Sequence, residues 1–293
     1  MASNEDYIAA LRDFNGLLHA TFQLSVKLNK LVGDSRKQIA SALFAKINLC
    51  ALSITKLLPK NSEISPREMT VMMEPDRFCD VSSIASLCRN LTEASNLLYY
   101  FGVEEVSPEE IQLRLQIGDY QALKGSIAVF HLIGYEGEHL DELQQELVKL
   151  KTALEISPAF MELDSWARKQ ILDGRKAATI SHREIACRRG LAADQFSADY
   201  RHLSSHVHSD AYALMDLLAG RKLGGPMTVE IRESLLAMIR ESTRYLAMTC
   251  QDTMVLFPEF QMTAEGLKKS DNSPRVNEMK TDEWTNKVTV GLP

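Results

Sequence analysis

The segment from Tyr200 to Tyr212, YRHLSSHVHSDAY, carries an unusual density of groups that can do chemistry. It contains three of the seven histidines of the chain, together with an arginine, three serines, an aspartate and both flanking tyrosines. Buried polar groups need hydrogen-bond partners, so a helix that only packs in a core does not normally collect so many of them. We therefore take this segment as the first candidate for a functional site.

One set of these residues suggests acid–base chemistry on a phosphate. At about 100° per residue, Arg201, Ser204 and His208 lie on one stripe of a helix. An arginine can hold a phosphate with two hydrogen bonds, and a histidine can transfer a proton near neutral pH. Metal-independent cleavage of RNA needs little more, because the ribose 2′-hydroxyl is itself the nucleophile.

A second set suggests a metal site instead. His202 and His206 stand four residues apart, which places two imidazoles on one helical face at zinc-ligand spacing, and Asp210 extends this row. Leu203 stands where the glutamate of an H-E-x-x-H motif would be. Further ligands would have to come from other segments, such as His182, Glu184 or Glu93. A metal-binding helical bundle is therefore one alternative.

The elements that position these residues are expected to be helices. Apolar residues recur at three- and four-residue steps through most of the chain, and no alternating strand pattern stands out. We predict an all-α protein, an antiparallel helical bundle that forms a single domain over residues 1–261. The expected helices cover roughly 5–32, 35–58, 78–101, 108–131, 138–154, 158–172, 182–189, 192–219 and 227–256. The polar and aperiodic residues 262–293 predict a largely disordered tail.

Capping signals support several of these helix boundaries. Ser107 precedes a proline and two glutamates, the order that is typical of a helix start. Ser181 and Glu184 have the spacing of a capping box.

Composition narrows the class of protein. The five cysteines form no C-x-x-C pair, which argues against a disulfide framework or a cysteine zinc knuckle and favours a reducing cytoplasm. The N-terminal residues lack a signal-peptide core, and no apolar run approaches the roughly 18 residues of a membrane span. Phosphate-binding and dinucleotide-binding glycine motifs are absent from the sequence. We therefore expect a cytoplasmic protein that binds no membrane and no cofactor.

The net charge of −6 argues against a protein that coats nucleic acid, but the charge is unevenly distributed. From Arg168 to Arg189 the chain carries seven basic residues against two acidic ones. This excess indicates either a solvated helix face or a surface for a polyanion such as RNA. In the second interpretation the RNA-binding residues are Arg175, Lys176, Arg183, Arg188 and Arg189.

The motif Arg201–His202–x–x–x–His206 resembles the R-x(4–6)-H signature of HEPN-fold ribonucleases, in which a polar residue often follows the arginine. The spacing from Arg201 to His208 also satisfies it. The resemblance implies an all-α homodimer in which two copies of the motif build one site, and a bacterial defence or stress system as its setting. It implies a metal-independent RNA-cleaving or RNA-binding protein, in which Arg201 binds the phosphate and His206 or His208 is the general acid or base.

A second resemblance covers roughly residues 80–215. The pairs Arg89-x3-Glu93 and Tyr200-x2-Leu203-Ser204-x3-His208 look like a widespread family of uncharacterised bacterial helical proteins. It implies a helical fold with a polar cluster of Arg89, Glu93, Tyr200, Ser204 and His208, and it makes His208 the important histidine. The two resemblances disagree on the histidine, and the sequence leaves that question open.

The same polar residues also permit a purely structural interpretation. Hydrogen bonds between Arg89, Glu93, Tyr200, Ser204 and His208 would fix the register of two helices without any catalysis. The protein would then be a non-catalytic helical interaction protein.

Overall fold

The structure is a computed structural model that describes residues 3–28, 33–58, 80–208, 211, 215 and 229–258. These residues form helices and no strand, which confirms the predicted all-α class. The elements are α1 (Asn4–Leu28), α2 (Ser35–Leu57), α3 (Val81–Leu98), the π-helical turn η3 (Tyr99–Val103), α4 (Pro108–Leu132), α5 (Glu138–Glu155), α6 (Pro158–Met161), α7 (Ser165–Leu172), α8 (His182–Arg188), α9 (Ala193–His208) and α11 (Val229–Leu256).

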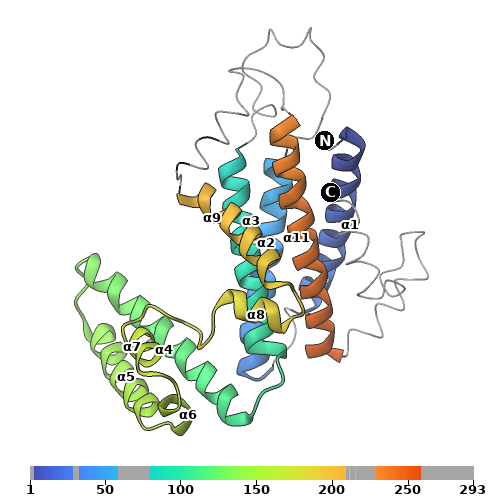
Figure 1. Ribbon diagram of the computed structural model, residues 1–293. Coiled ribbons are helices and arrows are strands. Elements are labelled where there is room, and N and C mark those ends of the chain that lie inside the picture. The colour runs from blue at the N-terminus through green and yellow to red at the C-terminus, as the bar shows by residue number, and fades with distance from the viewer. Residues whose placement is uncertain are drawn as a thin grey trace.

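The main body is a bundle of α1, α2, α3 and α11, and α9 packs against α3 (Figure 1). Its core is a continuous cluster of fully buried apolar side chains, which includes Phe14, Phe44, Ile47, Ile84 and Leu91. Among the described helices, α2 is long and apolar enough to cross a membrane by length and composition. In the structure it packs between α1 and α3, so its apolar character also suits a core helix.

Helices α4 to α7 form an arm that projects from the bundle (Figure 1). The arm has a small core of its own, made of Leu113, Ile117, Tyr120, Leu154, Phe160 and Ile171.

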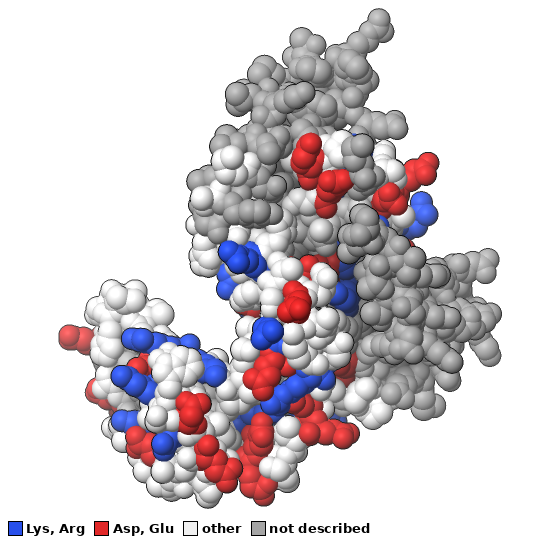
Figure 2. Space-filling model, in the orientation of Figure 1, with Lys and Arg blue, Asp and Glu red and all other residues white. Residues whose placement is uncertain are grey.

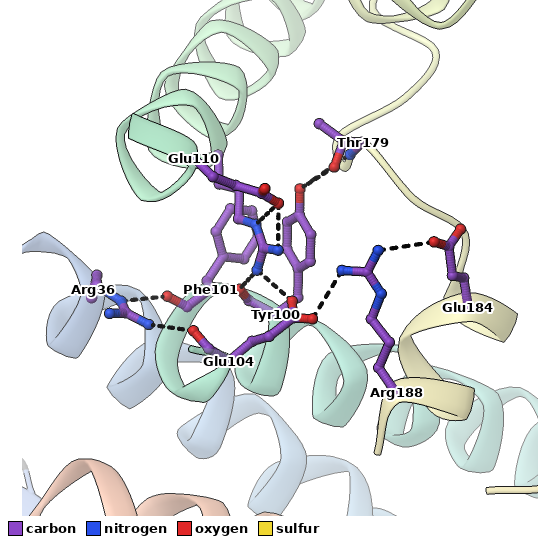
Figure 3. A network of polar contacts seen from close by, with 9 residues as sticks. Arg36, Tyr100, Phe101, Glu104, Glu110, Thr179, Glu184 and Arg188 are labelled. Atoms are coloured by element: carbon purple, nitrogen blue, oxygen red, sulfur yellow. Dashed lines mark hydrogen bonds and ion pairs between the residues drawn. The ribbon is translucent and has the colours of Figure 1, made fainter. Parts of the chain in front are cut away.

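A network of arginine and glutamate side chains joins the arm to the bundle (Figure 3). The side chain of Arg114 is 2% exposed, and its guanidinium lies 2.6 Å from a carboxylate oxygen of Glu104 and 2.6 Å from one of Glu110. It also donates to the carbonyl oxygen of Tyr100. Arg188 of α8 binds the other oxygen of Glu104 at 2.9 Å. Glu104 therefore ties α4 of the arm to α8 of the bundle.

Two expected helices differ from those observed. The helix expected over 158–172 is divided into α6 and α7, because Asp164 interrupts it and caps α7 by accepting the amide of Ala167 at 2.7 Å. The helix expected over 78–101 changes at Tyr99 into the turn η3. There the carbonyl oxygens of Tyr100 and Phe101 accept from arginine side chains.

Other expectations are met or lie outside the described residues. Ser107 caps α4 and Ser181 caps α8, each by accepting an amide three residues on, at 3.2 and 3.1 Å. The helix expected over 192–219 is described as α9 and at two further helical positions, 211 and 215. The tail expected over 262–293 lies outside the described residues.

Candidate functional site

A cluster of four polar side chains lies between α3 and α9. Arg89 and Glu93 are one helical turn apart on α3, and the Arg89 Nε lies 2.9 Å from a carboxylate oxygen of Glu93. The hydroxyl of Tyr200 on α9 donates to the same oxygen at 2.6 Å and accepts from Nη2 of Arg89 at 3.0 Å. Nη1 of Arg89 lies 3.4 Å from Nε2 of His208. We call Arg89, Glu93, Tyr200 and His208 the Arg89 cluster.

The Arg89 cluster is half-buried at one end and open at the other. The side chains of Arg89 and Glu93 are 23% and 27% exposed, whereas His208 is exposed. The guanidinium of Arg89 also lies over the Tyr200 ring, 5.0 Å from its centroid. The cluster therefore presents His208 to solvent and holds Arg89, Glu93 and Tyr200 half-buried beside it.

The electrostatics of the cluster favour the ion pair. Burial raises the pKa of Glu93, but hydrogen bonds from Tyr200 and Arg89 outweigh it and hold that pKa below its ordinary value. Burial and the bond to Glu93 raise the pKa of Tyr200. Burial opposes the charge of Arg89, but its bonds to Glu93 and Tyr200 raise its pKa. At neutral pH the cluster thus contains a carboxylate, a guanidinium and a protonated phenol.

His182, the first residue of α8, belongs next to this cluster. Burial lowers the pKa of His182, and the nearby carboxylate of Glu93 opposes that effect. Its Nδ1 is buried and has no hydrogen-bond partner among the described residues. The sequence suggests His182 only as a metal ligand. In the sequence, the Ser181 cap marks the start of α8. The contact of α8 with α3 is tertiary, and no local sequence pattern predicts it.

The structure does not bring Arg201 and His206 together. Arg201 is exposed, whereas His206 is 1% exposed and lies against His202, with ring centroids 5.1 Å apart. Five residues on a helix correspond to about 140° of separation, so the two side chains point to different sides of α9. Arg201 and His208, which are seven residues apart, share the exposed side. The expectation that His206 acts on a substrate beside Arg201 therefore does not fit this geometry.

Ser204 does not join the Arg89 cluster through its hydroxyl. That hydroxyl donates to the carbonyl oxygen of Tyr200 at 2.7 Å, one turn back on the same helix. This bond satisfies the serine locally, as is common for serine inside a helix.

The alternative metal row is only partly described. Asp210 lies outside the described residues, and Nε2 of His202 lies 3.2 Å from the Ser234 hydroxyl. Across the part of the chain that the structure describes, no group of three or more histidine, cysteine, aspartate or glutamate side chains is arranged to hold a metal ion.

The five basic residues expected to bind RNA fall into two groups. The side chain of Arg189 is 2% exposed and binds Asp252 at 2.7 Å, so it cannot contact a polyanion. Arg188 is engaged by Glu104 and Glu184 in the joint with the arm. The prediction was wrong for Arg189, because its guanidinium is bound by the buried Asn96 of α3 and the half-buried Asp252 of α11.

The other three basic residues remain accessible to different degrees. Arg175 and Arg183 are exposed. Lys176 is half-buried and donates to the carbonyl oxygen of Thr179 at 2.7 Å. Arg175 and Lys176 lie on the segment that leads from α7 to α8, and Arg183 lies in the first turn of α8.

Comparisons of the chain with protein-family models, curated proteins and solved structures find no match. A solvent-facing imidazole beside a guanidinium, supported by a carboxylate and a phenol, can accept or donate a proton next to a bound anion.

Proposed function

We propose that this protein binds and cleaves RNA without a metal ion, in the manner of the HEPN-like proteins that its motif resembles, and that the Arg89 cluster is its site. The observation that supports the proposal best is the meeting of Arg89 from α3 with His208 from α9 at the surface, 3.4 Å apart. A cation and a proton-transfer group next to each other are what the 2′-hydroxyl chemistry of RNA requires.

In this proposal each residue has a separate role. His208 takes the proton from the 2′-hydroxyl, whose oxygen attacks the adjacent phosphorus and forms a 2′,3′-cyclic phosphate. The bond from phosphorus to the 5′-oxygen breaks, and that leaving oxygen takes up the proton from the His208 imidazolium. The guanidinium of Arg89 has five N–H donors, and its contacts with Glu93, Tyr200 and His208 engage three of them, so two can bind phosphate oxygens. Glu93 and Tyr200 are positioning residues, because they hold Arg89 in place. Arg201, on the same exposed side of α9, would contact a neighbouring phosphate.

The proposal assigns the acid–base role to His208 and not to His206, because a side chain that is 1% exposed cannot reach an RNA strand. It keeps the homodimer and the bacterial defence or stress system that the resemblance implies, and the cytoplasmic location expected from the cysteine pattern.

The test is incubation of the purified protein with a mixture of fluorescently labelled RNAs in EDTA. We expect cleavage that falls about 100-fold or more in His208→Ala, the range that loss of a general acid or base produces. Arg89→Lys keeps the charge but loses the planar donors, and should also lower cleavage. His139→Ala is the matched control, since this histidine is exposed on the arm and should leave the rate unchanged.

A lack of cleavage by the wild-type protein, or equal rates for wild type and His208→Ala, would show that the proposal is wrong.

One observation favours a second candidate function, a non-catalytic helical interaction protein. The groups of the Arg89 cluster bind one another, which is what a network that fixes the register of α3 and α9 would do. In that case Arg89→Ala lowers the melting temperature, and no RNA is cleaved by any variant.

A further inference from the structure

An exposed tryptophan stands on the arm, away from the Arg89 cluster. Trp166 lies in the first turn of α7 and is 64% exposed. Tryptophan has the largest aromatic ring and gains much from burial, so an open indole is a candidate contact surface. The Nζ of Lys176 lies 5.9 Å from the centroid of the Trp166 ring, so one cation already lies over the indole.

Basic side chains accompany this tryptophan. Residues 165–180 contain four basic residues and one acidic residue, Asp173. Lys169 and Arg175 are exposed, and Arg168 and Lys176 are half-buried. Just before α7, the carboxylate of Asp164 is engaged by the amide of Ala167 as a helix cap. Figure 2 shows Lys and Arg side chains on the face of the arm that is turned to the viewer, with acidic side chains also present there.

The helix that carries Trp166 is held firmly on α4. Ile171 is fully buried in the arm core, and the carbonyl oxygens at the end of α7 accept from α4 side chains. Gln121 donates to Ile171 at 2.7 Å, and Tyr120 donates to Leu172 at 3.0 Å. The indole is therefore presented outward by a fixed helix and not by a loose loop.

We propose that Trp166 is a stacking platform for the unpaired bases of single-stranded RNA, and that Lys169, Arg175 and Lys176 bind the phosphates on either side. A flat aromatic ring with cations beside it is the combination that binds single strands with little regard to sequence. Paired bases are less suitable, because their faces are already stacked inside a duplex. The choice of RNA over other single strands rests on the proposed function.

The position of Trp166 relative to the Arg89 cluster is fixed by contacts between the arm and the bundle. Residues 173–181 lead from the end of α7 to α8, whose first residue, His182, interacts electrostatically with Glu93. Within this connection Thr179 is bonded to Tyr100 of η3, with 2.8 Å between the hydroxyls. The network of Arg114, Glu104 and Arg188 fixes the arm as well (Figure 3). A strand bound at Trp166 is thus held at a set position relative to His208.

Intrinsic fluorescence tests this proposal directly, because the chain has two tryptophans. The variant Trp284→Phe leaves Trp166 as the single reporter, and His208→Ala in the same protein prevents cleavage during titration. We expect a saturable quenching of Trp166 by an unstructured RNA of about 12 nucleotides. In parallel anisotropy measurements, Trp166→Ala should weaken binding about tenfold. Arg175→Ala with Lys176→Ala should weaken it and reduce its salt dependence.

Val148→Ala is the matched control, since this apolar residue is 64% exposed on α5 of the same arm and should not alter binding. The proposal is overturned if RNA does not quench Trp166, or if Trp166→Ala binds as tightly as wild type. It is also overturned if heparin quenches Trp166 as strongly as RNA does, because that result indicates a general polyanion surface without base stacking.

The two proposals fail separately. Quenching of Trp166 without any RNA cleavage leaves the platform in place and refutes the catalytic role of His208. Cleavage that depends on His208 but is indifferent to Trp166→Ala refutes the platform alone.

Discussion

Replacing Arg114 by methionine should destabilise the protein by about 3 kcal/mol. Breaking a buried ion pair by removing one partner costs roughly 3–5 kcal/mol, because the remaining charge is left buried. The Glu104 carboxylate would be that charge, since its side chain is 9% exposed. Arg188 still binds it and is 38% exposed, so the cost belongs at the low end of this range. The half-exposed contact of Arg114 with Glu110 adds at most about 1 kcal/mol.

Urea unfolding followed by two probes measures this free energy. Far-UV circular dichroism reports the whole helical content, and the fluorescence of Trp166, in a Trp284→Phe background, reports the arm. Coincident transitions allow a single free energy of unfolding to be derived. If the arm separates from the bundle in Arg114→Met, the Trp166 transition should occur at lower urea than the circular dichroism transition.

A second substitution tests the physical cause. Adding Glu104→Gln to Arg114→Met removes the buried charge and should restore about 1–2 kcal/mol, because a neutral amide costs less to bury than a carboxylate. Lys149→Met is the control, as its pair with Glu146 is exposed on both sides and should matter by less than about 1 kcal/mol. A loss below about 1 kcal/mol in Arg114→Met, or no recovery in the double variant, would refute the reasoning.

Two further predictions concern titratable groups. The hydrogen bonds of the N-cap Asp80 with Ser83 hold its pKa below 3.8, so the cap contributes stability above that pH and loses it as pH falls through the lower folded-state value. Asp80→Ala should therefore cost about 1 kcal/mol at pH 7, and urea denaturation should show the difference shrinking in acid. Glu93→Gln should lower the pKa of His182 further, because burial already lowers it and the carboxylate opposes that effect. An NMR titration in which this pKa stayed the same or rose would contradict the contact.

Local signals in the sequence predict much of the fold. Ser107 and Ser181 mark helix starts through hydrogen bonds to residues three positions away, so the relevant physics is contained in a few neighbouring residues. The i, i+4 pair of Arg89 and Glu93 is local in the same sense. The contact of this pair with Tyr200 was expected from a motif resemblance, and the structure brings the three side chains together.

The sequence does not predict which charged and polar side chains are buried. Arg189 belongs to a run of basic residues that predicts a surface, yet α3 and α11 enclose it. Arg114 gives no local sign that Glu104, ten residues earlier, lies against it. In each case the packing of the helices determines which residue is the partner. The same packing determines whether the charge is solvated or paired.

The packing of α9 decides which of its histidines can meet a substrate. Measured from Tyr200 at about 100° per residue, His208 lies near 80° and Arg201 near 100°, whereas His206 lies near 240°. Leu203, near 300°, is 2% exposed, so the arc around it faces the bundle. His206 is on that buried side, whereas His208 and Arg201 share the open arc. A substrate could reach His206 only if α9 left α3, which would also break the bonds of Tyr200 to Arg89 and Glu93. Any chemistry that α9 performs in the folded protein therefore depends on its exposed side.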